Sequence, residues 1–464
     1  MMSALECAAA VRIDLINNTD ECKRSAFAQH LTPPETAELA VSMFSDGHDG
    51  SLRCLDLGAG SGILSVAVYE RYGELIDYID VVESDPVLAS VCQDELRRLN
   101  VTFNLVVGDA LRATPAKQYD RVILNPPYKK MSAGDPRQQF MPFRSANLYV
   151  AFVAIGLTRL SPGGELIAII PRSWMNGGYF TSFRRFILEG YSIDSFHIYE
   201  SRTNVFAETD VLQETMIVRI SNNRQRETVH VGSSNGRADQ VTWKSYPAKD
   251  LIDSNSLVIR VAPECNGSVQ STISAEGLCP STGKVVDFRS RERIYYDRPN
   301  EEGIYPLVYA GNFAGGAIEH PLDFGKPQWF RADTQTTINQ LTREGFYVVV
   351  KRFSSKEERR RVVAYPLHVQ SPIGIENHLN FIHAGKPRKV VPLSSMELAQ
   401  GLALWLNSTF IDKWFRDVSG STQVNAGDIK AMPCPSLSDL ERIGVYWRAD
   451  LTQEMIDAIC EELK

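Results

Sequence analysis

The chain has 464 residues, which is too long for one ordinary domain and leads us to expect two. Hydrophobic residues make up 44% of the sequence and charged residues 23%, as in a soluble globular protein, and no apolar run is long enough to span a membrane. The formal net charge of −7 argues against a uniformly basic nucleic-acid binder, although it leaves room for a local basic face.

The eight cysteines are scattered, without a Cys-x-x-Cys pair and without histidines at metal-ligand spacing. We therefore expect reduced thiols and no metal site. The first residues, Met1 to Cys7, lack the basic and apolar segments of a signal peptide. These features predict a cytoplasmic protein without a membrane partner, and we expect it to be a monomer.

Predicted strands and helices alternate through the first half of the chain. Strands are predicted at residues 52–57, 78–82, 103–107, 119–124, 165–170, 193–199 and 214–220, and helices at 63–72, 86–99, 146–160 and 180–189. This alternation is typical of a doubly wound α/β fold with a parallel sheet. Such sheets bind ligands at the carboxyl ends of their strands.

The ends of the first four strands carry polar residues, in the order Asp56, Glu83, Asp109 and Asn125. After the first strand, three alternating glycines at 58, 60 and 62 would let the backbone pass close to a ligand at the start of a helix. Asp56 or Glu83 alone is compatible with an ordinary strand-end cap. As an ordered set, the four residues predict one ligand-binding edge.

The pattern favours a ligand without phosphate. The glycine spacing is tighter than G-x-G-x-x-G, which leaves less of a cradle for a pyrophosphate, and Asp56 suits a cationic amine. Glu83 falls where a ribose diol would be held, and Asp109 falls where an adenine amino group could donate. A ligand with an ammonium group, a ribose and an adenine is S-adenosylmethionine, which we predict as the cofactor.

The fourth strand runs into Asn125-Pro126-Pro127-Tyr128. The prolines fix φ and lack an N–H, so the chain is stiff here. The Asn125 side chain and the Pro126 carbonyl could both accept hydrogens from one planar amino group, and Tyr128 offers a flat face for the attached ring. The motif therefore fits the exocyclic amine of adenine, and the alternative is an ordinary rigid turn.

The alternation ends after a polar, turn-rich stretch between residues 221 and 242. We place the domain boundary there, which gives domains of residues 1–240 and 241–464. The second half has short strand-like runs, such as 303–309 and 346–351, and predicted helices at 396–416 and 453–463.

These motifs resemble the γ-class of adenine-N6 DNA methyltransferases of restriction-modification systems. The matching segments are residues 55–62, 82–86, 108–110 and 125–128. Upstream, residues 29–33 (Gln-His-Leu-Thr-Pro) are similar to the family's opening motif, whose Thr-Pro backbone contacts the cofactor's methionine end. The resemblance implies a Rossmann-like S-adenosylmethionine-dependent methyltransferase domain followed by an α+β target-recognition domain.

The resemblance also implies roles for individual residues. The expected cofactor contacts are Thr32, Pro33, Asp56, Gly58, Gly60, Glu83, Ser84, Asp109, Ala110 and Asn125. The expected catalytic residues are Asn125, Pro126, Pro127 and Tyr128, with Phe206 at the position of a second aromatic against the target base. Phe206 is equally compatible with an ordinary core position.

The second half also resembles recognition domains, in the basic run Lys351–Arg361 and in residues 406–409 and 420–425. If the strand before this run continues, Arg352 and Lys356 face the same side. The DNA-contact candidates are Arg352, Lys356, Arg359, Arg360, Gln423 and Asn425. The alternatives are a solvated basic face and a loop stabilised by its own amides.

The predicted reaction is methyl transfer from S-adenosylmethionine to adenine N6 in double-stranded DNA, after the base is flipped out of the helix. A cognate restriction endonuclease would be a separate protein. Three alternatives stay open: an RNA adenine methyltransferase, a protein glutamine N-methyltransferase, and a non-catalytic DNA-specificity subunit.

Overall fold

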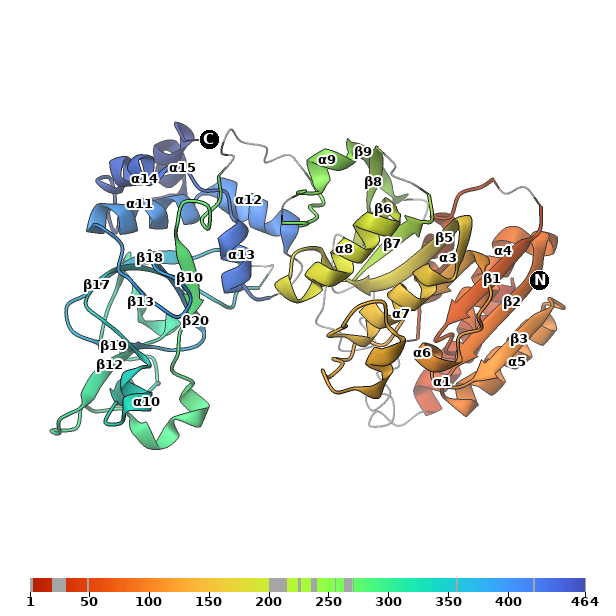
Figure 1. The fold of residues 1–464 in the computed structure, drawn as a ribbon, viewed down its shortest axis with the longest axis horizontal. Helices are drawn as coiled ribbons and strands as arrows, with labels where there is room; N and C mark the ends of the chain where they lie inside the picture. The colour runs from red at the N-terminus through yellow and green to blue at the C-terminus, as the bar shows by residue number, and fades with distance from the viewer. Residues whose placement is uncertain are drawn as a thin grey trace. The chain divides into compact units, whose positions relative to one another are not determined.

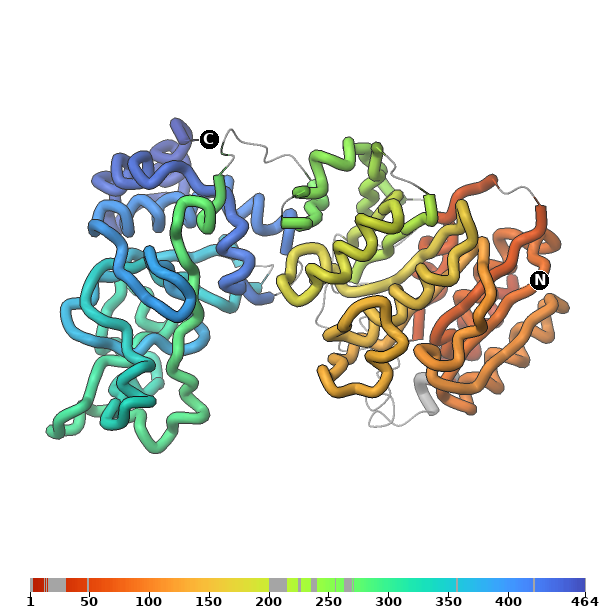
Figure 2. Tube along the Cα trace, in the orientation of Figure 1, coloured from red at the N-terminus to blue at the C-terminus, as the bar shows by residue number. Residues whose placement is uncertain are grey.

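The computed structural model describes residues 3–18, 31–47, 50–199, 215–223, 227–234, 240–254, 256–262, 269, 271–355, 358–419 and 422–463. The chain divides into two compact units, Met1–Val261 and Ala262–Lys464. The colours of Figure 2 show that each unit is one continuous stretch of chain. Among the described residues, no helix combines the length and the apolar character needed to cross a membrane.

The first unit is built on a mixed sheet (Figure 1). Its described strands lie in the order β3 (Phe103–Val107), β2 (Ile76–Glu83), β1 (Leu52–Leu57), β4 (Tyr119–Leu124), β5 (Leu160–Pro171), β7 (Thr215–Ser221), β6 (Ser192–Tyr199), β8 (Thr228–Ser234) and β9 (Thr242–Pro247). The first five in this order are parallel, as predicted. Their carboxyl ends therefore meet at one edge of the sheet.

One part of the sheet differs from the prediction, because β7 lies antiparallel between β5 and β6. The sequence between β6 and β7 carries no helical pattern, and antiparallel neighbours need no crossover helix. The prediction of seven strands was correct, but the prediction of a wholly parallel sheet was not.

Helices cover both faces of this sheet. One face packs against α1 (Ala4–Asn18), α3 (Pro34–Ser42), α4 (Ile63–Tyr72) and α5 (Pro86–Arg98), and the other against α6 (Ala110–Ala113), α7 (Leu148–Thr158), α8 (Thr181–Gly190) and α9 (Ala248–Leu251). Strand residues alternate between the two cores. Val122 and Leu124 of β4 pack on the side of α7, whereas Ile123 packs on the side of α4.

The first unit extends beyond the boundary that the sequence suggested. β8 pairs with β6, and β9 pairs with β8, so both strands belong to the large sheet. The unit ends at Val261 rather than at residue 240. The polar stretch that suggested the earlier boundary borders this added pair of strands.

The second unit contains smaller sheets. The described strands form a sheet in the order β10 (Cys279–Thr282), β20 (Leu379–His383), β17 (Gly345–Lys351) and β18 (Ala364–Val369). Another has the order β11 (Ile294–Tyr295), β15 (Trp329–Arg331), β12 (Ile304–Val308), β19 (Ile373–Ile375) and β16 (Leu341–Thr342), and β13 (Phe313–Ala314) pairs with β14 (Ala317–Ile318).

The helices of the second unit are α10 (Gln335–Ile338), α11 (Met396–Leu406), α12 (Thr409–Val418), α13 (Ala426–Ala431), α14 (Leu437–Gly444) and α15 (Gln453–Glu461). The prediction of one helix over 396–416 was wrong, because the helix breaks at Asn407-Ser408. The Asn407 side chain bonds both backbone groups of Ala364, at 3.0 and 2.7 Å. The Ser408 hydroxyl caps α12 by accepting from Ile411 N at 3.3 Å.

Candidate functional site

The glycine loop between β1 and α4 is held against the end of β2. Gly58 N and Ala59 N donate to the Val82 carbonyl at 2.8 and 3.2 Å. Gly58 and Gly60 have φ of 74° and 58°, in the left-handed region that favours glycine. A Cβ at Gly58 would lie 3.2 Å from the Phe152 ring. The loop conformation therefore requires the glycines that the sequence singled out.

Asp56 lies beneath this loop and is buried. Its Oδ2 accepts from Ser65 Oγ at 2.7 Å. Its Oδ1 is also buried and has no hydrogen-bond partner among the described residues. Burial raises the pKa of Asp56 to about 7. A buried oxygen without a donor is costly in a folded protein, so this atom suits a ligand that brings a donor.

Glu83 ties the loop to the tip of β2. Its Oε2 accepts from Gly60 N at 2.8 Å, and its Oε1 accepts from Asp85 N at 2.8 Å and from Ser84 Oγ at 3.3 Å. Ser84 is exposed, whereas Glu83 is buried. The carboxylate thus shapes the loop itself, in addition to any contact with a ligand.

Asp109 caps α6, because its Oδ1 accepts from Leu111 N at 3.1 Å. Its Oδ2 lies 3.6 Å from the Arg137 guanidinium. The side chain is partly exposed beside the buried Ala110. Asp109 therefore acts as a helix cap, and its carboxylate stays at the same edge of the sheet as Glu83.

Asn125 is fixed on both sides of its carboxamide. Its Nδ2 donates to Thr32 Oγ1 at 2.9 Å, across 93 residues of sequence, and its Oδ1 accepts from the Tyr128 hydroxyl at 3.2 Å. Thr32 is buried, and Pro33 precedes α3 as its N-cap. Pro126 is buried and Pro127 is half-buried. The structure thus joins the predicted opening motif to the predicted catalytic motif.

The Tyr128 ring is held by contacts with β5 and α7. Its hydroxyl lies 3.1 Å from the Ile169 carbonyl, and its ring packs edge-on against Tyr149 with 6.3 Å between ring centroids. Burial, reinforced by Tyr199 and Tyr149, raises the pKa of Tyr128 well above its ordinary value. The phenol therefore stays neutral and can act as a hydrogen-bond donor.

Sequence reasoning missed two supporting residues. Ser65 bonds Asp56 from the first turn of α4, and Tyr149 packs against Tyr128 from the first turn of α7. Both follow the N-terminus of a helix that starts at the ligand-binding edge. That position was the signal that could have identified them.

Phe206 and Lys356 lie outside the described residues. Of the other predicted DNA contacts, Arg352 is half-buried and donates to the Asn377 carbonyl at 2.9 Å. The sequence led us to expect that the strand continues through Arg352. Instead, β17 ends at Lys351, so strand alternation does not determine where the Arg352 side chain points.

The arginines that follow differ in exposure. Arg359 is exposed, whereas Arg360 is half-buried, donates to the Asn407 carbonyl at 3.2 Å and has its pKa lowered by burial. Arg361 is buried over the Phe415 ring, 5.1 Å from its centroid. The basic run is therefore only partly a surface feature.

The two predicted amide contacts lie on one segment. Gln423 is half-buried and forms an isolated bridge with Phe353. Asn425 precedes α13, where its backbone N and its Nδ2 both donate to Asp428 Oδ2, at 2.8 and 3.1 Å. The alternative of a loop stabilised by its own amides therefore holds for Asn425.

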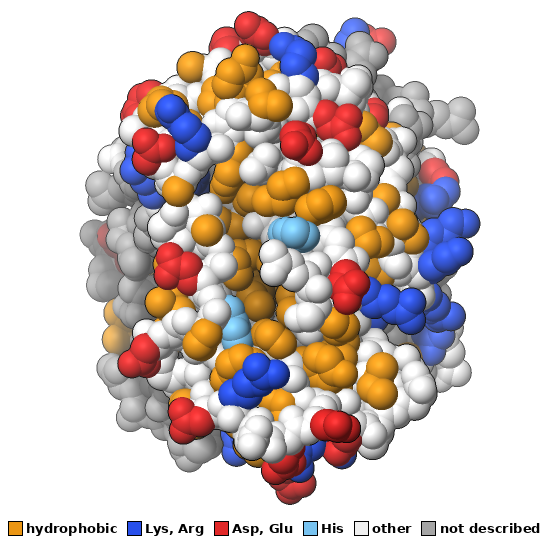
Figure 3. Space-filling view, turned by 90° about the vertical axis from the view of Figure 1, so that its left-hand side faces the viewer, with side chains coloured by type: hydrophobic (Ala, Val, Ile, Leu, Met, Phe, Trp, Pro, Cys, Tyr) orange, Lys and Arg blue, Asp and Glu red, His pale blue; other side chains and the backbone are white. Residues whose placement is uncertain are grey.

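Figure 3 shows a face of the second unit on which hydrophobic side chains surround a hollow, with acidic and basic side chains interspersed. This face is not uniformly basic, in keeping with the formal charge of −7.

Comparison with known proteins identifies the family. Residues 90–206, which include Asn125 to Tyr128, match the Eco57I restriction-modification methylase family. The chain is 33% identical over 480 residues to the type II methyltransferase M.BsuBI of Bacillus subtilis, covering 95% of this chain and 94% of that protein. It is 32% identical over 464 residues to the type II methyltransferase M.PstI of Providencia stuartii, covering 91% of this chain and 90% of that protein. The chain belongs to the type II DNA methyltransferases of restriction-modification systems.

A solved structure of the type IIL restriction-modification enzyme MmeI in complex with DNA has a similar fold. The structural alignment covers 99% of this chain and 73% of the MmeI chain, with a TM-score of 0.56 and 13% sequence identity. The comparisons confirm the predicted fold class, the methyltransferase activity and S-adenosylmethionine as the methyl donor. The buried Oδ1 of Asp56 and the glycine loop fit such a ligand, because they provide an acceptor for its ammonium group and a close backbone approach.

Proposed function

We propose that this methyltransferase modifies N6 of an adenine in double-stranded DNA. The observation that carries the proposal is the Asn125 carboxamide, held between Thr32 and Tyr128. Because its nitrogen donates to Thr32, its oxygen is oriented as an acceptor for an amine. An adenine N6 hydrogen would join or replace the Tyr128 hydroxyl at this oxygen, and the Pro126 carbonyl would accept the second hydrogen.

The residues around the glycine loop would hold the cofactor. Asp56 Oδ1 would accept from the ammonium group, the Gly58–Gly60 backbone would pass beneath the ligand, and Glu83 would face the ribose. Asp109 and Ala110 would face the adenine ring, while Ser84, Thr32 and Pro33 would complete the edge. Bound there, S-adenosylmethionine supplies a methyl group on a positively charged sulfur, which is a good leaving group.

The protein's contribution to the reaction is mainly orientation. Two acceptors on the N6 hydrogens localise the nitrogen lone pair, which forms the new N–C bond as the S–C bond breaks and its electrons stay on sulfur. The amine then loses one proton to solvent. Alignment and fixed dipoles lower the barrier in this arrangement.

The target adenine must leave the duplex to reach Asn125, at a cost of a few kcal/mol. Stacking on the Tyr128 ring offsets part of this cost, by about 1–3 kcal/mol per base. Phe206 is the proposed second aromatic at this position. Burial keeps the Tyr128 hydroxyl protonated, so the ring is presented without a charge.

The second unit is the proposed DNA target-recognition domain, and the first is the proposed catalytic domain. Of the candidate contacts, Arg359 is exposed and is our first choice for a phosphate contact. Arg352, Lys356, Arg360 and Gln423 are proposed as further contacts, with Asn425 positioning the loop. A restriction endonuclease of the same specificity would act as a separate polypeptide, and we expect this chain to act as a monomer.

The family assignment favours duplex DNA over the RNA and glutamine substrates that share the catalytic motif. It also favours an active transferase over a non-catalytic specificity subunit. The test is the transfer of labelled methyl groups to DNA, followed by digestion and identification of the methylated base. N6-methyladenine is the expected product. Label in RNA or protein but not in DNA, or on cytosine, would refute the proposal.

The first prediction concerns Asn125→Ala, which we expect to abolish methylation while S-adenosylmethionine binding is retained. The physical reason is that the variant loses the side-chain acceptor for N6 but leaves the Asp56–Glu83 site in place. Asn104→Ala is the matched control, because Asn104 is an exposed asparagine on the edge strand β3 whose side chain donates to Asp80 at 2.8 Å and to no residue assigned to the site. Turnover by Asn125→Ala at the control rate would disprove the assigned role.

A further inference from the structure

The segment that follows β5 displays an aromatic side chain to solvent. Tyr179 is 89% exposed, the highest value for any large hydrophobic side chain in the described part of the chain. It lies in the short turn Gly178–Phe180, just after Gly177. A single exposed apolar residue is usually unremarkable, so what matters is how this one is held.

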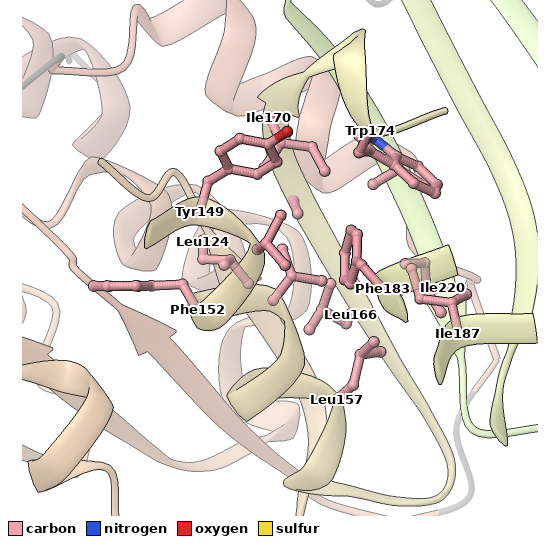
Figure 4. Close-up of a cluster of buried hydrophobic side chains, with 14 of the residues drawn as sticks. Leu124, Tyr149, Phe152, Leu157, Leu166, Ile170, Trp174, Phe183, Ile187 and Ile220 are labelled. Carbon is pink, nitrogen blue, oxygen red and sulfur yellow. The ribbon is translucent and has the colours of Figure 1, made fainter. Parts of the chain in front are cut away.

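A buried arginine fixes the turn. Arg184 of α8 is 2% exposed, and its guanidinium donates to the carbonyls of Trp174 and Gly177 at 2.8 and 2.9 Å. The Trp174 ring packs against Phe183 with 5.5 Å between centroids. Figure 4 shows Tyr149, Trp174 and Phe183 in the same buried cluster. The backbone that leads to Tyr179 is therefore anchored to α8.

The turn also connects to the proposed catalytic motif through aromatic rings. Tyr128 packs on Tyr149, and Tyr149 packs on Phe180 with 5.9 Å between centroids. Phe180 is the neighbour of Tyr179 in sequence. The series that begins at the Asn-Pro-Pro-Tyr motif thus ends at Phe180, and the adjacent residue in the turn, Tyr179, exposes its ring at the surface.

We propose that Tyr179 stacks on a base of the DNA beside the extruded adenine and so positions the strand for methyl transfer. This inference rests on the proposed function. Because the backbone before it is anchored and a tyrosine has only two side-chain torsions, Tyr179 loses little conformational freedom when it binds, and its flat face accepts any base. A Cβ at the adjacent Gly178 would meet no atom within 4 Å, so the space beside this turn is open to a nucleic-acid strand.

The test compares Tyr179→Ala and Tyr179→Phe with the wild type on a duplex that contains the methylated sequence. That sequence is first identified by mapping methylated bases in cells that express the full chain. Binding is measured by fluorescence anisotropy, and KM for DNA and kcat by methyl transfer. We expect Tyr179→Ala to weaken DNA binding by about 5- to 150-fold, the range that loss of one stacked base predicts.

Several readouts separate stacking from other effects. Tyr179→Phe should bind DNA like the wild type, and the salt dependence of Tyr179→Ala should be unchanged because no phosphate contact is lost. S-adenosylmethionine affinity and Tm should also be unchanged. Leu75→Ala is the matched control, since Leu75 is 53% exposed and precedes the amino end of β2, at the opposite edge of the sheet.

An unchanged Kd and KM for Tyr179→Ala, or an equal loss in Leu75→Ala, would overturn the inference. Methylation of the same duplex by the wild-type protein tests the proposed function separately. If the wild type methylates adenine and Tyr179→Ala matches it, the inference alone fails.

Discussion

The Tyr128 hydroxyl bridges two parts of the site, since it lies within hydrogen-bond distance of Asn125 Oδ1 and of the Ile169 carbonyl. Tyr128→Phe removes these bonds but keeps the ring. We expect a loss in kcat of about 5-fold, corresponding to about 1 kcal/mol for one hydrogen bond, with little change in Kd for DNA. Single-turnover methylation and anisotropy measure the two effects. An equal loss in both would mean that the hydroxyl contributes to binding rather than to orientation.

If Asp56 accepts from the ammonium group of the cofactor, as proposed, its raised pKa of about 7 should make cofactor binding depend on pH. The carboxyl group is largely neutral below this pH and ionised above it, and only the ionised form attracts an ammonium group strongly. We therefore expect S-adenosylmethionine affinity to increase as pH rises through about 7. Binding near neutral pH should release up to one proton. Calorimetry in two buffers of different ionisation enthalpy measures this release, which Asp56→Asn should eliminate.

The same carboxyl group should lower the stability of the folded protein as pH rises, whereas it should raise the affinity for the cofactor. Its pKa in the folded protein exceeds that of an unfolded aspartate, so the folded state binds more protons between about pH 4 and pH 7. Its contribution to stability is complete below this window and is lost as pH rises through it. Denaturant unfolding without cofactor should show a smaller decline across this window in Asp56→Asn than in the wild type.

At the scale of elements, the basic run Lys351–Arg361 separates into structural and surface residues. Arg361 is 1% exposed, and its Nε donates to Ser354 Oγ at 3.1 Å. Arg361→Ala should therefore destabilise the second unit by about 3 kcal/mol. The exposed Arg359 is the matched control, and Arg359→Ala should change stability by less than about 0.5 kcal/mol. Denaturant unfolding of the two variants tests the distinction.

Arg359→Ala has its own expected result in DNA binding. Loss of one phosphate contact should weaken binding on any sequence and reduce the slope of log K against log salt by about 0.9. A slope equal to that of the wild type would remove Arg359 from the proposed interface without affecting the catalytic assignment.

The sequence predicted the elements of the first unit well, because their patterns are local. The strand at residues 103–107 and the helix at 63–72 have the predicted bounds. Prediction from the sequence failed where contacts between distant residues determine the structure. The helix break at Asn407 depends on bonds to Ala364, and the burial of Arg361 depends on Phe415, neither of which a charge pattern reveals.

For the whole molecule, the meeting of the candidate residues at one edge could be predicted because each motif follows its own strand and the strands are parallel. Asp56, Glu83, Asp109 and Asn125 then meet at one edge by topology alone. The pairing of Asn125 with Thr32 could not be derived in this way, because it spans 93 residues and depends on how α3 packs. The resemblance indicated that both act at one site but not through which atoms.

The division into two units predicts that cofactor binding can be separated from sequence-specific DNA binding. A fragment ending at Val261 contains the whole glycine loop and Asn125, so it should bind S-adenosylmethionine like the full chain. Without the second unit, it should lose sequence-specific DNA binding and methylation. Calorimetry and anisotropy on the fragment check both expectations. Site-specific methylation by the fragment alone would place recognition in the first unit.

Close packing at the start of α4 buries a cysteine whose reactivity can report on the opening of this region. Gly62 has a φ of 87°, and a Cβ there would come within 2.7 Å of Cys92 Sγ on α5. Cys92 is fully buried, and burial raises the pKa of its thiol. Alkylating reagents can reach this sulfur only when the packing around it opens. The rate at which Cys92 is labelled therefore measures how often this packing opens, and S-adenosylmethionine bound at the proposed site beside the glycine loop should slow it.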